Sequence, residues 1–470
     1  MIITEQSLIQ FNRCPILVDK ELSNAELSQV NIHEKRALLS LICSQQHLPQ
    51  PTFESDYDLS TTHTPLHAKS FIHPKITFNS CRISPDLITF SHKHCSIYWL
   101  SLAFRPRAND ILQLSYHYHI LKSAGYIVDK CLLFTLNPQY SKGGSRPLFN
   151  SQSMDYTCKK KEAKVKRLIS TISEQHFSST PSLDHHCFKP TQCDQFSTCW
   201  PDHESWSIFH VVRLPFKEKL SLFQKNIHSF EDFKTEYKHI SPLQYKQLSV
   251  DLSNTAYVNQ TQVNALFKQL TYPLQCFDLE VAQFANPLFK HEIPFSKLPF
   301  LYSVHHVNDS LQELDHRDQL FLPHDDFRLA LTESLLSDLS PESSIIVFDA
   351  TLEKAVLDDL AHLFPQFKKE ISAIQDAIID IAPLFIDHHV ILPGMKGKSS
   401  LKAILSALDS SFSYSSSSVK SGLDAVHSYK NLFFCPEDSH GDIIDTLKHY
   451  CKLDTQALVE ILRVLKPYLS

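Results

Sequence analysis

Apolar and polar positions along the chain repeat with two different periods, and each period predicts a different element. Apolar residues at alternating positions predict strands over residues 75–78 and 87–90, and residues 127–136 are predicted as a further strand. Helical spacing predicts a short helix over residues 3–12 and a longer one over residues 110–123, which ends just before Gly125. Residues 1–210 are therefore expected to form a small mixed sheet with helices packed on it.

The second half of the chain repeats this mixture after a polar, helical stretch over residues 211–270, which we interpret as a linker subdomain. Residues 271–470 are expected to form a second α/β unit. Its elements are predicted as strands over residues 276–282, 300–306 and 344–348, and as helices over residues 326–339, 352–363 and 442–465. A chain of 470 residues exceeds the usual size of one domain, so the pattern predicts two α/β domains joined by helices.

The amino-acid composition excludes several classes of function for this chain. The chain is 43% hydrophobic and 20% charged, as expected of a globular protein. Its 7 glycines cannot form the glycine-rich loops of P-loop ATPases, kinases or nicotinamide enzymes. The sequence contains no apolar run long enough to cross a membrane and no secretory signal at its N-terminus. The twelve cysteines therefore predict a reducing, cytoplasmic location.

The overall charge does not by itself predict a nucleic-acid partner. The formal net charge is −6, so any basic surface must be local. One candidate is the run Lys159–Lys161 with Lys164, Lys166 and Arg167, although a solvent-exposed helix face is the favoured interpretation. His388 and His389 are candidates for a contact with a substrate phosphate.

Three acidic motifs carry the main functional signal. Asp278 and Glu280 are two residues apart on a predicted strand, so their side chains share one face. Glu353 follows directly after another predicted strand, and Tyr450 and Asp454 share one face of the last helix. Clustered carboxylates suit Mg²⁺ or Mn²⁺, and two such ions hydrolyse phosphodiesters. Tyr450 is placed to orient or help deprotonate the attacking water.

Each of these motifs also has a structural interpretation. A D-x-E pair arises often by chance, and a Y-x-x-x-D pair on a helix is usually surface decoration. Glu353 can serve as an acid at a helix N-terminus, where the helix dipole favours it. His449 offers a second spacing to Asp454, but Tyr450 lies one helical turn away and is preferred. The order and placement of the motifs favour the catalytic interpretation.

The cysteines suggest a second site near the other end of the chain. Cys187, Cys193 and Cys199 are separated by two equal gaps, and Cys14 offers a fourth thiolate. Four such ligands suit an iron–sulfur cluster or zinc. The alternative is a set of free buried thiols, which is common among intracellular cysteines.

Residues 271–470 resemble DnaQ-like exonucleases of the DEDD type, which have a ribonuclease-H-like fold. The resemblance rests on F-D-L-E at 277–280, on Y-C-K-L-D at 450–454, and on residues 298–305, 347–354, 380–385 and 393–402. It implies that Asp278, Glu280, Glu353 and Asp454 bind two Mg²⁺ or Mn²⁺ ions and that Tyr450 positions a water.

Two positions depart from the family pattern. Asp349 stands where Asn is more frequent, and Glu353 fills the third acidic position in place of Asp. The longer carboxylate of Glu353 still reaches a metal, although the ligation geometry then differs. Asp380 is the runner-up ligand.

The first half is similar to RecB-like nucleases of the PD-(D/E)XK superfamily, and the domain order is similar to a bacterial family that joins the two domains. Residues 11–15, which contain Cys14, match the start of a pattern in which one N-terminal and three later cysteines hold a [4Fe–4S] cluster. Asp86 matches the first catalytic acid, but residues 99–105 lack the E-x-K that should follow, and His117 replaces a Gln. The resemblance therefore implies a degenerate restriction-endonuclease-like domain.

Together these observations predict a 3′–5′ exonuclease that acts on nucleic acid, with DNA favoured over RNA. A catalytically inactive nucleic-acid-binding scaffold is the alternative, and an iron–sulfur redox or regulatory protein is a third, weaker one. No protein partner is predicted.

Overall fold

The computed structural model divides the chain into two compact units. It describes residues 2–14, 17–18, 25–53, 56–59, 69–174, 183–189, 192–323, 325–408, 419, 421–433 and 440–469. Unit 1 comprises Met1–Cys199 with Phe284–Ser296, and unit 2 comprises Trp200–Gln283 with Lys297–Ser470. The predicted linker, residues 211–270, thus belongs to unit 2. Both units mix helices and sheets, as the hydrophobic pattern predicted.

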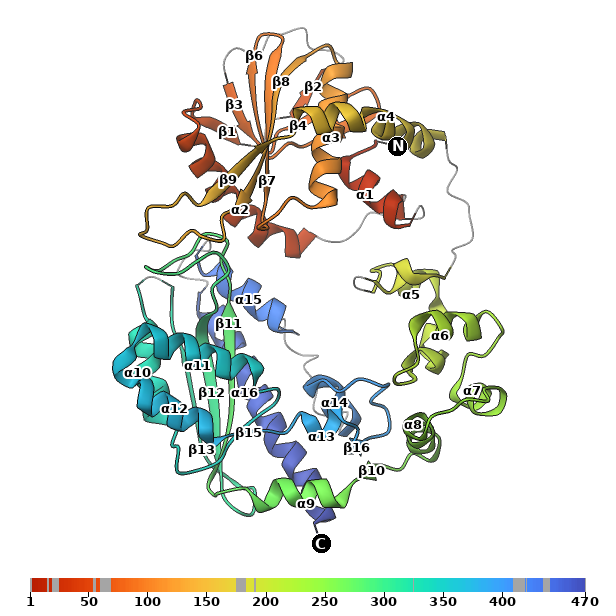
Figure 1. Cartoon of the computed structure of the whole chain (residues 1–470), viewed down its shortest axis with the longest axis vertical. Helices are drawn as coiled ribbons and strands as arrows, with labels where there is room; N and C mark the ends of the chain where they lie inside the picture. Colours follow the sequence, from red (N-terminus) through yellow and green to blue (C-terminus); the bar gives the residue numbers. More distant parts are fainter. Residues whose placement is uncertain are drawn as a thin grey trace. The chain divides into compact units, whose positions relative to one another are not determined.

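Unit 1 is built on a six-stranded sheet (Figure 1). Its strands, in spatial order, are β1 (Pro51–Phe53), β3 (Lys69–Ile72), β6 (Leu87–Ser91), β7 (His94–Ser101), β8 (Ile127–Leu136) and β9 (Phe149–Ser153). A smaller sheet contains β2 (Asp56–Asp58), β4 (Lys75–Phe78) and β5 (Cys81–Ile83). The predicted strands β4, β6 and β8 are confirmed.

Helices cover both faces of the six-stranded sheet. One apolar core packs Leu114, Tyr116 and other residues of α3 (Ala108–Ser123) against β7 and β8, together with α1 (Glu5–Arg13) and α4 (Asp155–Glu174). A second core joins Leu38, Leu39 and Ile42 of α2 (Ala25–Gln45) to Ile72, Leu87 and Phe134. The helices predicted over residues 3–12 and 110–123 correspond to α1 and α3.

Unit 2 contains a mixed five-stranded sheet in the order β13 (Glu313–Leu320), β12 (Leu298–Val307), β11 (Leu274–Ala282), β14 (Ile345–Val347) and β15 (Ile378–Asp380). β11, β12 and β13 are antiparallel neighbours, whereas β11, β14 and β15 run parallel. β11, β12 and β14 were predicted. β11 is the central strand, so its side chains are covered on both faces.

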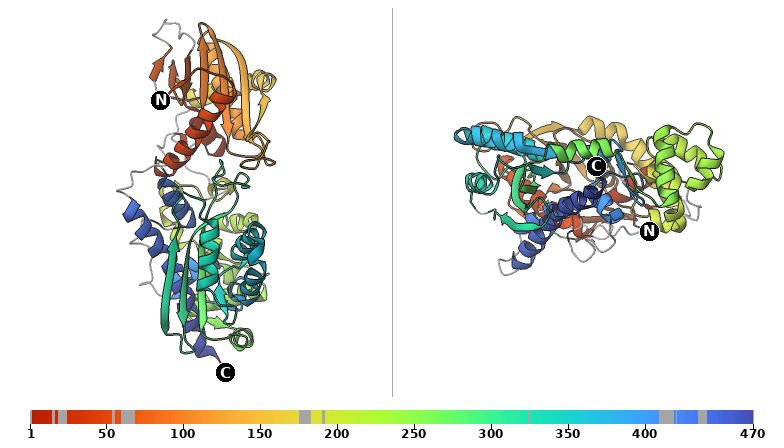
Figure 2. Two further views of the ribbon diagram at one scale, coloured as in Figure 1. Left: turned by 90° about the vertical axis from the view of Figure 1, so that its left-hand side faces the viewer. Right: turned by 90° about the horizontal axis from the view of Figure 1, so that it is seen from below.

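Helices again lie on both faces of this sheet. Figures 1 and 2 show α10 (Arg328–Asp338), α11 (Thr351–Leu363) and α12 (Lys368–Ala377) on one face, and α16 (His440–Leu465) on the other. The predicted helices match α10, α11 and α16. Leu458, Ile461 and Leu462 of α16 join the core that contains Cys276 of β11 and Ile346 of β14. Two short helices, α14 (Leu401–Leu408) and α15 (Gly422–Asn431), pack beside α16.

The stretch before β11 is helical, as predicted. It contains α6 (Phe216–Phe223), α7 (Phe230–Glu236), α8 (Pro242–Ser253) and α9 (Gln260–Lys268), and α6 to α8 surround a small core that includes Phe233 and Leu248. A two-residue ladder pairs β10 (Tyr257–Val258) with β16 (Val390–Ile391). Among the residues that the structure describes, no helix is both long and apolar enough to cross a membrane.

Thr455 fixes α16 against the sheet. Its buried hydroxyl lies 2.9 Å from the Ser303 hydroxyl and 2.8 Å from Nδ1 of His305, both on β12. We expect Thr455→Val to lower the free energy of unfolding of unit 2 by about 1–3 kcal/mol, because the His305 nitrogen loses its partner while remaining buried.

Thr446→Val is the matched control, since the Thr446 hydroxyl bonds only the Asp442 carbonyl oxygen of its own helix, at 2.7 Å. Thermal unfolding of both variants compares the two hydroxyls. Equal shifts in melting temperature would contradict a special role for Thr455.

Candidate metal centre

The acidic motifs of unit 2 meet at one edge of the sheet. β11, β14 and β15 are parallel, so their carboxyl ends lie together. Asp278 and Glu280 occupy the second half of β11, Asp349 follows β14, and Asp380 ends β15. Glu353 lies in the first turn of α11, directly after β14. Strand topology therefore gathers residues that are far apart in the sequence.

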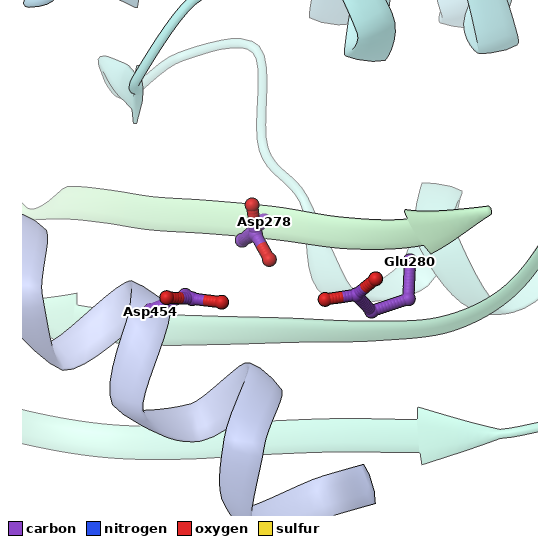
Figure 3. Close-up of side chains that lie close together, drawn as sticks. All are labelled: Asp278, Glu280 and Asp454. Carbon is purple, nitrogen blue, oxygen red and sulfur yellow. The ribbon is translucent and has the colours of Figure 1, made fainter. Parts of the chain in front are cut away.

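Three of the predicted ligands converge. One carboxylate oxygen each from Asp278, Glu280 and Asp454 lies within 4.8 Å of the others (Figure 3). Asp278 and Glu280 point from β11 toward α16, and Asp454 points back from α16. Cys451, one turn before Asp454, places its sulfur 3.6 Å from an Asp278 carboxylate oxygen. Asp278 and Glu280 share a face because side chains alternate along β11, and Asp454 joins them from the face that α16 turns toward this strand.

Glu353 lies beside this group and not within it. The residue is 4% exposed, and its Oε2 atom has no hydrogen-bond partner among the residues that the structure describes. Its charge raises the pKa values of Asp278 and Glu280, although less than burial and the neighbouring Asp454 do. A buried carboxylate oxygen without a donor is costly. A cation bound between Glu353 and the other three acids would satisfy it.

Asp380, the runner-up ligand, binds backbone N–H groups at the start of α11. Its carboxylate accepts hydrogen bonds from the backbone N–H groups of Asp349 (2.9 Å), Ala350 (3.1 Å) and Ala382 (2.9 Å). These bonds hold the turn from which α11 begins, and so they position Glu353. Asp349 has a left-handed backbone with φ 66°. Asp and Asn adopt this conformation more readily than most residues.

Tyr450 is buried one turn before Asp454, whereas His449 is exposed. Nζ of Lys402, on α14, lies 4.7 Å from the centre of the Tyr450 ring. The pKa of Lys402 is lowered by burial, and the charges of Asp454 and Glu280 oppose that change. Lys402 therefore adds a positive charge to the acidic centre.

The start of α15 also faces the centre. A Cβ atom on Gly422, the first residue of this helix, would lie 3.9 Å from Oε2 of Glu280. The positive end of the helix dipole thus approaches that carboxylate. Sequence reasoning missed both Gly422 and Lys402. Lys402 ends the matching run 393–402, so the resemblance contained a signal for it, but no signal pointed to Gly422.

Burial and mutual repulsion make the acids hard to ionise. Burial, followed by the charges of Asp454 and Glu280, raises the pKa of Asp278 well above its usual range. Burial and Asp454 raise the pKa of Glu280 to about 8, although Lys402 opposes this. Burial raises the pKa of Glu353 to about 7, with smaller effects from Asp349 and Asp380. Oxygen ligands that repel one another fit a hard divalent cation.

The four predicted cluster ligands all belong to unit 1, although no three of their sulfur atoms lie within 4.8 Å of one another in the described part of the chain. Cys14 follows α1, Cys187 ends a short 3₁₀ helix, and Cys199 ends α5 (Phe196–Cys199). Burial raises the pKa of Cys187, and the nearby Cys14, Cys193 and Cys199 raise it further.

Two hydrogen bonds fix this part of unit 1. Nε of Arg13 donates to the His186 carbonyl oxygen at 3.2 Å, and the Cys193 N–H donates to the Cys187 carbonyl oxygen at 2.8 Å. The first bond joins the end of α1 to the cysteine-containing segment, although the two are far apart in the sequence.

Asp86 of unit 1 is paired internally. Its carboxylate lies 2.7 Å from Nζ of Lys35 and 3.5 Å from Nε2 of His73, and it accepts a 2.7 Å hydrogen bond from the Leu100 N–H. Leu100 lies on β7, where the missing E-x-K would be. The His117 ring is fully buried without a hydrogen-bond partner, and Glu5 lies 3.7 Å from its Nε2. Asp86 thus forms a structural ion pair with Lys35 inside unit 1.

Comparisons with known proteins match parts of the chain. Residues 275–400 match a family described as a domain of unknown function, DUF2779, a stretch that includes Asp278, Glu280 and Glu353. An alignment of 220 positions, which covers 42% of this chain, shows 26% identity to Uncharacterized protein MG366 of Mycoplasma genitalium. The chain covers 32% of the length of that relative. No solved structure matches the chain.

The raised pKa values predict how stability depends on pH. Below pH about 4.5, Glu280 is protonated in both the folded and the unfolded chain; as pH rises toward its folded pKa of about 8, only the unfolded chain releases the proton freely. Ionisation therefore costs the metal-free protein several kcal/mol by pH 8.5. We expect Glu280→Gln to match the wild type near pH about 5 and to be more stable near pH about 8.5 in EDTA.

Thermal unfolding at the two pH values measures this difference. Mn²⁺ should stabilise the wild type more at the higher pH, because the ion binds the ionised carboxylates. A difference between variant and wild type that does not change with pH would contradict the account.

Proposed function

We propose that unit 2 is a metal-dependent 3′–5′ exonuclease in which Asp278, Glu280, Glu353 and Asp454 hold two Mg²⁺ or Mn²⁺ ions. The observation that carries the proposal is the convergence of three carboxylates at the edge of the sheet, beside the buried, unpartnered Oε2 of Glu353. Such an arrangement is unfavourable without cations, and its all-oxygen character suits these two metals.

The sheet around the centre supports the ribonuclease-H-like fold that the resemblance implies. Three antiparallel strands are continued by two parallel ones, and the acidic strand β11 is the central member. The last helix brings the fourth acid to that strand from the opposite face of the sheet to α11, as the motif order implies.

The residues of the centre divide the work of phosphodiester hydrolysis. The bound ions would polarise the phosphate and lower the pKa of an attacking water. Tyr450 would orient that water through its hydroxyl. Lys402 supplies a fixed positive charge next to the carboxylates, where a phosphate oxygen of the substrate can meet it. Asp380 keeps the turn before α11 in place, so Glu353 stays aligned.

The first prediction concerns hydrolysis of labelled strands. Wild-type protein with Mn²⁺ should shorten a 5′-labelled single strand stepwise from its 3′ end, with DNA and RNA of one sequence compared side by side. Asp278→Asn should lower the rate at least about 100-fold, since even outer-shell changes around metals cost 10–100-fold.

Asp376→Asn is the control, because it removes an exposed carboxylate from α12. It should retain the wild-type rate. If the wild type cleaves neither strand with Mn²⁺ or Mg²⁺, the exonuclease proposal fails, and the alternative of an inactive nucleic-acid-binding scaffold is favoured.

We infer that Cys14, Cys187, Cys193 and Cys199 ligate a [4Fe–4S] cluster in unit 1. Support comes from the proximity of Cys187 to the other three and from the bond between Arg13 and His186, which ties the first ligand to the later segment. A cluster would join the ends of this domain covalently through iron. The internal pairing of Asp86 supports a degenerate RecB-like domain that acts in structure or strand binding.

Metal analysis of protein purified without oxygen tests this inference. The wild type should contain about four iron atoms and four sulfides per chain and show visible absorption that dithionite bleaches. Cys187→Ser should lose most of the iron, whereas Cys43→Ala, which removes a buried thiol outside the group, should keep it. Stoichiometric zinc without iron, or no metal, would contradict the cluster.

A further inference from the structure

Three segments of unit 2 are tied together by hydrogen bonds to one helix, α8. Gln247 of α8 accepts a 2.9 Å hydrogen bond from the Val212 N–H and donates to the His210 carbonyl oxygen at 3.0 Å. Asp251, one turn further along α8, accepts a 3.2 Å hydrogen bond from the Gly394 N–H. These contacts bind the segment before α6 and the loop after β16 to the same helix.

Gly397 brings the loop and the segment close together. A Cβ atom at this position would lie 2.1 Å from the His210 carbonyl oxygen, so no other residue fits without movement. The residues around it have left-handed backbones: φ is 69° at Gly397, 52° at Lys396, 51° at Arg213 and 58° at His388. Such strain in non-glycine residues is characteristic of ligand-binding sites.

Four cations are displayed on this support, and we call them the basic platform: Arg213, Lys246, Lys396 and Lys398. Arg213, Lys396 and Lys398 are exposed. Lys246 is partly exposed, and its Nζ lies 3.8 Å from the centre of the Tyr257 ring. The platform therefore places mobile ammonium and guanidinium groups on a rigid base.

The local positive charge helps to lower the pKa values of two neighbouring histidines. Burial, then Lys396, Lys398 and the inner Lys219, lowers the pKa of His210 to about 4. Burial and Arg213 lower the pKa of His388, with a smaller effect of Lys246 and an opposing effect of Asp387.

Acids partly offset this charge. Asp387 is exposed next to His388, and Asp251 lies half-buried under the loop. In a chain whose formal net charge is −6, a surplus of positive charge at one place indicates an anionic ligand.

The platform lies within reach of the acidic centre. Lys398 precedes Lys402 by four residues, so their Cα atoms are at most about 14 Å apart. Lys402 itself interacts with Asp454 and Glu280. A strand whose end reaches the acidic centre would therefore pass its next phosphates near the platform.

We propose that the basic platform binds the phosphodiester backbone of the strand whose 3′ end enters the acidic centre. The proposal rests on the exonuclease function and adds the place where the substrate is held. Evenly spaced phosphates match several cations set along one surface, and such contacts do not depend on sequence. Tyr257, already under Lys246, offers an aromatic face to a base.

Strand binding tests the platform separately from hydrolysis. The full chain with Asp278→Asn is titrated with a fluorescent single strand, as DNA and as RNA, at several salt concentrations and without divalent metal. Adding Lys396→Gln and Lys398→Gln should weaken binding at least about tenfold at low salt. The slope of log affinity against log salt should fall by about 1.4.

Two further variants sharpen the comparison. Lys368→Gln with Lys369→Gln removes the same charge from exposed positions on α12 and should leave affinity and slope unchanged. Lys396→Arg with Lys398→Arg should restore binding.

The platform is overturned if Lys396→Gln with Lys398→Gln keeps the affinity and salt slope of the parent. It is also overturned if this pair and the control pair, Lys368→Gln with Lys369→Gln, lose affinity equally. Hydrolysis by the wild type is measured independently. A failed platform with active hydrolysis overturns the platform and leaves the exonuclease intact. Platform-dependent binding with no hydrolysis refutes the exonuclease and, with it, the proposal that the platform holds a strand for cleavage.

Discussion

Three carboxylates held together at the end of β11 repel one another. The organisation of unit 2 depends on the contacts and cations that offset this repulsion. Asp278, Glu280 and Asp454 approach within 4.8 Å, with Glu353 beside them. Folding tolerates this because hydrogen bonds elsewhere hold the elements that carry the acids. Thr455 fixes α16 to β12, and Asp380 fixes the turn before α11. The remaining charge then calls for cations: Lys402, the start of α15, and metal ions.

In unit 1, a buried carboxylate is instead paired with cationic side chains of the chain itself. Asp86 is as buried as the acids of unit 2, but Lys35 and His73 lie against its carboxylate and the Leu100 N–H bonds it. No charge is left over at that place for an added ion. This contrast explains why a chain with two nuclease-like resemblances is expected to carry out metal chemistry in only one of them.

Sequence patterns predicted the longer apolar strands and the helices with an apolar face. Apolar strand-length runs found β8 and β11, and helical spacing found α16 with Tyr450 and Asp454 on one side. The patterns missed β13, whose polar residues lie on an edge strand, and β15, which is only three residues long.

The site was predictable to the same extent. Asp278, Glu280 and Asp454 follow from local periods. Lys402 and Gly422 reach the centre only because α14 and α15 pack beside α16. Such tertiary placement leaves no local pattern. The basic platform was missed for the same reason, since its cations come from three separate segments.

The central claim is that the acidic centre holds divalent metal, and crystals of the full chain grown with Mn²⁺ test it most directly. The account predicts anomalous scattering peaks among the carboxylates of Asp278, Glu280 and Asp454, with Glu353 as a further ligand, and their loss in Asp278→Asn. Ordered carboxylates without a peak at saturating Mn²⁺, or peaks confined to other parts of the chain, would contradict it.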